Sequence, residues 1–317
     1  MTGRRTILGA ALALPALRAA AQEGVTRIQV GFAAGGGTDV MTRLLAERVR
    51  AAGGPGAVVV NRGGASGRFA VDALRAGPAD GTTLMIAPFG VPVMNPALFP
   101  GTGQESGADY LPVSRLATTE FALAVTAGHP ARDVPELTAW LRANRDRAAF
   151  GTAVLGNLPH FLGLAFGAAI GVPTEAVGYR GGGPMVTDLV GGQIGMAFSV
   201  DADFADMARA GRLRILATAG DTPSLVAPEA PTFASLGLPL RATGWNGLFA
   251  PLGTPTPVIA RIAADWGAAV RDPATAERLR GMGLRPTGEG PDAFARIIAA
   301  DAARWRPVIE ASGFRAT

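Results

Sequence analysis

Short β-type runs alternate with helical patterns along most of the chain, and this alternation constrains the fold more than any other feature of the sequence. The first predicted strand, residues 28–33, leads through a glycine-rich turn to a helix whose apolar residues Met41, Leu44, Leu45 and Val49 share one face. Such alternation predicts an α/β fold with parallel sheets covered by helices. With 317 residues, the chain is long enough for two α/β domains or for one large domain.

The amino-acid composition excludes several classes of protein. Hydrophobic residues make up 48% of the chain and charged residues 17%, which excludes a disordered or coiled-coil protein. The chain has no cysteine, so disulfides, thiolate metal sites and cysteine nucleophiles are excluded. All 29 basic residues are arginine, which excludes the lysine of a Walker phosphate loop or a Schiff base. A net charge of +4, without a basic run that contains aromatic residues, argues against a nucleic-acid partner.

The N-terminus has the three parts of an export signal. Arg4 and Arg5 precede an apolar run over 6–17, and an A-x-A site ends just before Gln22. Residues 1–21 are therefore predicted to be a signal peptide, and the mature protein is expected in the periplasm. The string GRRTIL resembles the twin-arginine motif, although paired arginines also occur in ordinary signals, so both export routes stay open. No later segment is predicted to span the membrane, because prolines interrupt the long uncharged stretches or leave them too short.

Four predicted strand-to-helix junctions carry small, glycine-rich turns, at residues 33–39, 63–67, 151–157 and 179–184. Ligands of open α/β sheets bind beyond the carboxyl ends of the strands, where helix N-termini offer free N–H groups and a positive dipole. Glycine lets the backbone approach a ligand closely. Two such turns in each half of the chain predict a cleft that can hold a carboxylate.

Four long strings of this sequence resemble one known family in the same order: VGFAAGGGTDVMTRLLAERV, VVVNRGGASGRFAVDALRAGPADGTTLMIA, VGYRGGGPMVTDLVGGQIGMAF and WNGLFAPLGTPTPVIARI. The family is that of the tripartite tricarboxylate transporter solute receptors, also called TctC or Bug proteins. The resemblance implies a periplasmic-binding-protein type II-like fold with two α/β domains and a ligand cleft between them. It also implies the domain layout: residues 22–120 and 242–317 form a discontinuous domain 1, and residues 121–241 form domain 2.

The resemblance implies that small carboxylates bind largely through backbone donors of the glycine loops. The candidate ligand-binding residues are Gly35, Gly36, Gly37, Thr38, Asp39, Ala65, Ser66, Gly67, Thr152, Gly156, Asn157, Arg180, Gly181 and Gly182. Two of them have alternative roles. Asp39 lies in the first turn of a helix, where a carboxylate stabilises the dipole without touching a ligand. Arg180 could pair with a ligand carboxylate or lie on the rim of the cleft.

Departures from the family pattern predict what kind of carboxylate is bound. Asn157 and Leu158 stand where serines are usual, and Ser199 stands where the family often has aspartate. Loop side chains expected to form the wall of the cleft are Phe32, Phe89, Val154, Leu155 and Leu158. This wall favours a mono- or dicarboxylate with an apolar or aromatic body over citrate or a plain amino acid. Three further acidic residues, Asp201, Asp203 and Asp206, begin a predicted helix and are expected to serve its dipole and solvation.

The sequence therefore predicts a solute-binding protein that delivers a carboxylate to the membrane permease subunits of a tripartite tricarboxylate transporter. The alternative is a sensor subunit that reports the carboxylate to a membrane kinase. An enzyme is not expected, because the loop around Ser66 misses the last glycine of the nucleophile elbow and no paired carboxylates flank the cleft. No catalytic residue and no cofactor are predicted. The two histidines are far apart, so no metal site is expected either, and the protein is expected to be a monomer.

Overall fold

The computed structural model describes residues 25–101 and 109–316, so the predicted signal peptide lies outside the described residues. The elements of the N-terminal part are β1 (Thr26–Val30), α1 (Gly37–Ala51), β2 (Ala57–Asn61), η1 (Ala65–Gly67), α2 (Arg68–Arg75), β3 (Thr83–Pro88), η2 (Gly90–Met94), α3 (Asn95–Leu98) and β4 (Tyr110–Thr126). The middle part contains α4 (Val134–Ala143), η3 (Arg145–Arg147), β5 (Ala149–Thr152), α5 (Leu158–Ile170), β6 (Glu175–Gly178), α6 (Gly182–Val190), β7 (Met196–Val200), α7 (Asp201–Arg209), β8 (Leu213–Thr218) and η4 (Ala234–Leu236). The C-terminal part contains β9 (Thr243–Pro251), α8 (Thr256–Arg271), α9 (Pro273–Gly281), β10 (Arg285–Glu289) and α10 (Pro291–Ser312).

The strands form a mixed sheet in the order β2-β1-β3-β9-β4-β7-β5-β6, with β8 and β10 also paired to β4. The pairs of β1 with β2 and β3, and of β5 with β6 and β7, are parallel, as the alternating pattern predicts. The sheet also has an antiparallel centre that the alternating pattern does not predict, because β9 runs antiparallel to both β3 and β4. Strand β4 is also antiparallel to β7, β8 and β10. The parallel strands β1–β3 and the parallel strands β5–β7 are therefore joined through the antiparallel strands β9 and β4.

Strand β4 is one continuous strand of 17 residues, whereas the sequence pattern predicts two short strands, at 111–116 and 121–126. It pairs with β9 up to Glu120 and with β7 from Phe121 onward. Polar residues such as Ser114 and Thr118 interrupt the apolar pattern of β4, yet both are buried because strands pair on both sides of it. Strand β4 thus passes from one half of the molecule into the other between residues 120 and 121.

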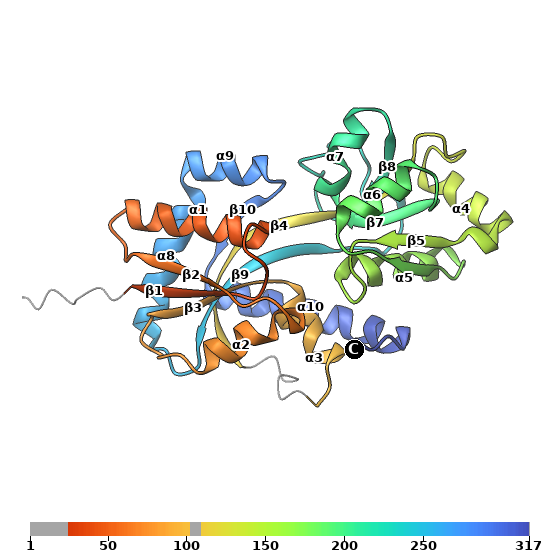
Figure 1. Ribbon diagram of the computed structural model, residues 1–317. Coiled ribbons are helices and arrows are strands. Elements are labelled where there is room, and N and C mark those ends of the chain that lie inside the picture. The colour runs from red at the N-terminus through yellow and green to blue at the C-terminus, as the bar shows by residue number, and fades with distance from the viewer. Residues whose placement is uncertain (1–24, 102–108, 317) are drawn as a thin grey trace, which may run out of the picture.

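Figure 1 shows these two halves joined by β4 and β9. The first half contains β1–β3, β10, most of β9, and helices α1, α2, α8 and α9. The second half contains β5–β8 and helices α4–α7. The division of the chain into two domains, with the bounds that the resemblance implies, stays a prediction.

The largest buried apolar cluster spans both halves: it contains Met85 and Phe249 from the first half and Phe161 and Phe198 from the second. A separate core of the first half lies between the sheet and helices α1 and α8. Helix α5 is apolar nearly all round, and most of it is buried in the shared cluster. None of the helices described by the structure is long and apolar enough to cross a membrane.

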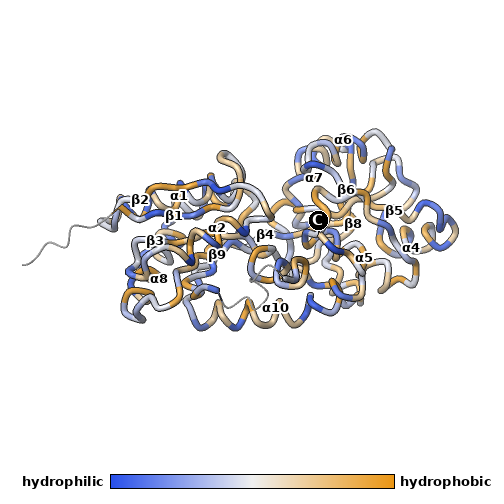
Figure 2. The backbone as a smooth tube through the Cα atoms, turned by 60° about the horizontal axis from the view of Figure 1, so that its bottom comes forward, coloured by the Kyte–Doolittle hydropathy of each residue, from blue (hydrophilic) through white to orange (hydrophobic). Residues whose placement is uncertain are grey.

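Helix α10 connects the two halves along one side of the molecule, as the view in Figure 2 also shows. It packs on β4 and η2, and its C-terminal part reaches α5. Its Asp301 Oδ2 accepts a hydrogen bond of 2.9 Å from Trp245 Nε1 of β9. The residues that follow α10 therefore lie beside the loops of the second half.

Candidate functional site

A cavity of about 420 Å³ lies where the loops of the two halves meet. Its residues come from both halves, from β4 and β9 between them, and from the segment after α10. They are Phe32, Ser66, Pro88, Phe89, Gly90, Val91, Asn95, Leu98, Phe99, Thr119, Phe121, Ala153, Val154, Leu155, Gly156, Asn157, Leu158, Pro159, Ser199, Val200, Asp203, Gly244, Trp245, Asn246 and Ala316. A largely apolar concave site with a few polar groups is typical of small-molecule binding.

Some of the predicted site residues line this cavity, and others do not. Ser66, Gly156 and Asn157 line the cavity. All five predicted wall side chains, Phe32, Phe89, Val154, Leu155 and Leu158, also line it. The other predicted residues are not among those that line it: Gly35, Gly36, Gly37, Thr38, Asp39, Ala65, Gly67, Thr152, Arg180, Gly181 and Gly182.

The loop before α1 is held from within by Asp39. The buried Asp39 carboxylate accepts hydrogen bonds from Gly35 N–H (2.9 Å), Arg43 Nε (3.0 Å) and Asn61 Nδ2 (2.9 Å). The bond from Arg43, helped by the other two donors, lowers the pKa of Asp39 to about 2 against the effect of burial. This carboxylate ties the glycine loop to α1 and β2. Its position matches the structural alternative in the sequence analysis, and the Gly35 N–H is not free for a ligand.

The start of α1 does not line the cavity, but it is hydrogen-bonded to a residue that does. Thr38 Oγ1 donates a hydrogen bond of 3.1 Å to Asn246 Oδ1, and Asn246 lines the cavity from β9. Within the described part of the chain, no acceptor binds the N–H groups of Gly37 and Thr38. These two N–H groups at the positive end of a 15-residue helix keep their capacity to bind an anion.

The second glycine loop, η1, has an unusual backbone. Both Ala65 (φ 47°) and Ser66 (φ 55°) are in the left-handed region, which costs a non-glycine residue free energy. The amide of Asn95, a buried residue, donates a bond of 2.9 Å to the Ser66 carbonyl and so fixes the loop. Ser66 N–H has no acceptor among the described residues, and Ser66 lines the cavity.

The loop between β5 and α5 is fixed by a buried histidine. Gly156 N–H donates a bond of 3.1 Å to His160 Nδ1, and burial lowers the pKa of His160, which keeps that nitrogen an acceptor. The Phe314 ring packs edge-on against His160, with 4.9 Å between ring centroids. His160 thus has a structural role in this loop, and Phe314 of the tail after α10 packs against it. The sequence carries no local signal for that contact of the tail, which also adds Ala316 to the cavity.

The fourth glycine loop is tied to the third. Gly181 N–H donates a bond of 2.8 Å to the Ala153 carbonyl, so the two loops of the second half hold each other. Arg180 is exposed, and within the described residues it neither lines the cavity nor forms a salt bridge. Thr152 is buried, and its hydroxyl has no hydrogen-bond partner in the residues described.

One charged side chain lines the cavity, and it is acidic. Asp203 projects from the first turn of α7, and Ser199 Oγ donates a hydrogen bond of 2.5 Å to its Oδ2. Burial raises the pKa of Asp203, while the bond from Ser199 opposes this shift. Asp201 and Asp203 lie in the first turn of α7, where a carboxylate can serve the helix dipole as expected, and the position of Asp203 in the cavity lining adds to that role. Asp206 is exposed, Asp201 is buried and bonded to Ser224, and Asp203 faces the cavity.

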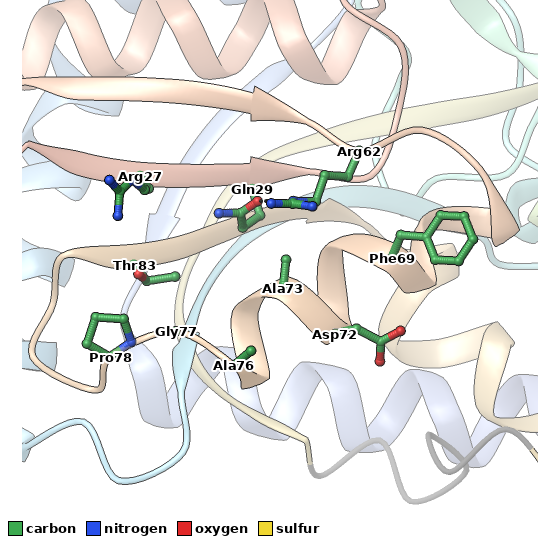
Figure 3. A pocket seen from close by; sticks show the side chains of 10 residues that line it. All are labelled: Arg27, Gln29, Arg62, Phe69, Asp72, Ala73, Ala76, Gly77, Pro78 and Thr83. Atoms are coloured by element: carbon green, nitrogen blue, oxygen red, sulfur yellow. Dashed lines mark hydrogen bonds between the residues drawn. The ribbon is translucent and has the colours of Figure 1, made fainter.

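A second, larger hollow of about 750 Å³ lies elsewhere, between α2 and the face of strands β1–β3 (Figure 3). Its residues all come from the first half, and none of the glycine loops lines it. Arg62 Nε already donates a bond of 3.0 Å to Gln29 Oε1 there. Of these two cavities, the smaller one is lined by loops from both halves, and it is therefore the candidate site.

Comparison with known proteins places this fold in a class. Solved structures that share it include periplasmic binding proteins of the TctC and Bug type. An R. palustris protein solved with adipate is 29% identical, with a TM-score of 0.78 over 91% of this chain and 97% of that chain. MatC from Rhodopseudomonas palustris, solved with bound malate, is 28% identical, with a TM-score of 0.73 over 90% and 98% of the two chains.

The sequence comparisons identify the family within that class. The profile of the Tripartite tricarboxylate transporter family receptor, TctC, matches residues 41–314. Protein BugT of Bordetella pertussis is 31% identical over 90% of this chain and 88% of its own. The chain belongs to the TctC receptor family, which confirms the resemblance seen in the sequence.

Proposed function

We propose that this protein is a periplasmic solute receptor that binds a small carboxylate in the cavity between its halves and delivers it to a tripartite tricarboxylate-type permease. Export by the N-terminal signal and a monomeric state are parts of the same proposal. We expect the two halves to close around the bound ligand, with the hinge where β4 and β9 join them.

The observation that carries the proposal is that Ser66, a residue with an unpaired backbone donor, and several apolar side chains line one cavity. Ser66, whose N–H group has no acceptor among the described residues, lines the cavity. Thr38, at the start of α1, donates a hydrogen bond from its hydroxyl to Asn246, which also lines the cavity. Backbone donors at helix starts recognise a carboxylate without a basic side chain. Phe32, Phe89 and Leu158 offer an apolar surface for the rest of the ligand. The relatives solved with adipate and malate support a carboxylate as the ligand class.

A thermal-shift screen of carboxylic acids tests the proposal. At about 100 times its dissociation constant, a true ligand adds roughly 2.7 kcal/mol to the free energy of unfolding, a rise of roughly 5 °C in Tm. We expect acids with apolar or aromatic bodies to raise Tm, and citrate and plain α-amino acids not to. If only citrate or α-amino acids raise Tm, the proposal that the ligand has an apolar or aromatic body is wrong. If no carboxylate raises Tm and none copurifies with the protein, the receptor proposal itself fails.

A further inference from the structure

The carboxylate of Asp203 lies directly in front of the amino end of α6. A Cβ placed at Gly182, the first residue of that helix, would lie 2.5 Å from Asp203 Cγ and 2.6 Å from both carboxylate oxygens. Only a residue without a side chain fits beneath this carboxylate. The helix α6 has nine residues, and its positive end already faces an internal anion.

The position of Asp203 determines which charged group of a ligand can lie against the second half of the molecule. A ligand carboxylate that reached the α6 loop would meet the like charge of Asp203 in a cavity that offers no basic side chain among its described lining residues. Like charges at short range in a poorly solvated site repel strongly. The α6 loop is therefore unsuited to a second ligand carboxylate, although the sequence analysis counts Gly181 and Gly182 as carboxylate donors.

Asp203 has room for a further partner. Its Oδ2 accepts one hydrogen bond from Ser199, whereas no hydrogen bond to Oδ1 is found among the described residues. No basic side chain is among the described residues that line the cavity, so the compensation that the chain itself supplies is the partial positive charge at the amino end of α6. A partly buried carboxylate with one donor gains free energy when a cation or a further donor reaches it.

We propose that the ligand has a cationic group, an ammonium in the simplest case, which pairs with Asp203, and that its single carboxylate lies at the opposite wall near Ser66. The inference rests on the proposed function, because it assumes that a carboxylate binds in this cavity. It names the ligand class as zwitterions whose two charges are separated by an apolar or aromatic body. Adipate and malate, the dicarboxylates of the two relatives, would lack the group that Asp203 selects.

Two sets of matched acids test the inference by isothermal titration calorimetry. The aliphatic set is hexanoate, 6-aminohexanoate and adipate; the aromatic set is 4-methylbenzoate, 4-(aminomethyl)benzoate and terephthalate. Within a set, only the end opposite the carboxylate changes from apolar to cationic to anionic. We expect the wild-type protein to bind the amino acid of at least one set about tenfold or more tightly than the dicarboxylate.

Three variants assign the preference to Asp203. Asp203→Asn should remove most of the preference and bring the two affinities to within about threefold. Ser199→Ala keeps the negative charge and should keep the preference. Asp206→Asn is the matched control, since Asp206 lies on the same helix with an 82% exposed side chain that pairs with Arg209, so the wild-type ratio should persist.

The outcomes separate this inference from the proposed function. If hexanoate or 4-methylbenzoate binds and the ammonium brings no gain over the dicarboxylate, the inference is overturned while the receptor function stands. An unchanged ratio in a folded Asp203→Asn protein, judged by its circular dichroism melt, overturns it as well. If no member of either set binds the wild-type protein, both the inference and the apolar-body carboxylate proposal are overturned.

Discussion

Glu120 is a buried acidic residue at the point where β4 passes from one half of the molecule into the other. It is 6% exposed and is the last residue of β4 to pair with β9 before the strand enters the second half. Its Oε2 has no hydrogen-bond partner in the described chain. Burial, together with the negative charge of Asp201, raises the pKa of Glu120 from 4.5 to about 7, although Arg285 counteracts part of this shift.

The raised pKa makes a prediction with a definite sign. Because the folded state disfavours the ionised form, the penalty grows as pH rises from 4.5 to about 7 and is constant above that. Glu120→Gln removes the ionisation and keeps the shape of the side chain. We expect it to raise the free energy of unfolding by about 2 to 3 kcal/mol at about pH 8 and by little at pH 4.5. Urea unfolding at the two pH values measures this, with the exposed Glu229→Gln as control. An equal effect at both pH values would contradict the assignment.

Individual residues show how far the sequence could predict the site. The five wall side chains were predictable, because apolar residues in loops at strand ends have few places to lie except a cleft. Asp203 was not predictable, since an acidic residue in the first turn of a helix is normally explained by the dipole. Its role depends on Gly182, which is distant in sequence and approaches it only in the folded chain. The free N–H groups could be foreseen as a class, but not that Gly35 donates to Asp39 and Gly181 to Ala153.

At the scale of elements, the contact between the end of β1 and η1 positions the first wall. A Cβ at Gly31 would lie 2.6 Å from Gly67 Cα and 3.0 Å from Gly67 O. Both neighbours are backbone atoms, and Gly67 itself has a φ of 87°, so neither side can yield by a rotamer change. The loop that presents Ser66 therefore depends on glycine at position 31.

Substitution at Gly31 tests this close approach. Gly31→Ala should lower the free energy of unfolding by about 1 to 3 kcal/mol, because the added carbon forces the loop away from β1. Gly37→Ala is the matched control, since a Cβ there meets no heavy atom within 4 Å, and we expect a change of about 0.5 kcal/mol or less. Urea unfolding of both variants gives the comparison. Equal stabilities would show that β1 and η1 are not held in this contact.

Elements with local signals were predicted well, and those fixed by distant partners were not. The glycine loops, α5 and the parallel pairs follow from patterns within a few residues. The continuity of β4 depends instead on β9 and β10, which arrive more than 100 residues later and bury its polar positions. The contact of Phe314 with His160 is equally non-local.

At the scale of the whole molecule, the account depends on one cavity that neither half could form alone. Ser66 comes from the first half, Asn157 and Asp203 from the second, and Trp245 from β9 between them. The family comparison gives the class of protein, and we propose that the side chains of this cavity determine which carboxylate is bound.

The most direct test of that central claim is calorimetric titration of a variant in which the cavity is filled. Ala153 lines the cavity, and Ala153→Trp adds bulk to a space of about 420 Å³. Ala300→Trp, on an exposed position of α10, is the control. With the acid that raises Tm most in the screen, we predict that wild type and Ala300→Trp bind one equivalent, while folded Ala153→Trp binds at least about a hundredfold more weakly. Unchanged affinity in Ala153→Trp would contradict the account, because the carboxylate would then bind somewhere other than between the halves.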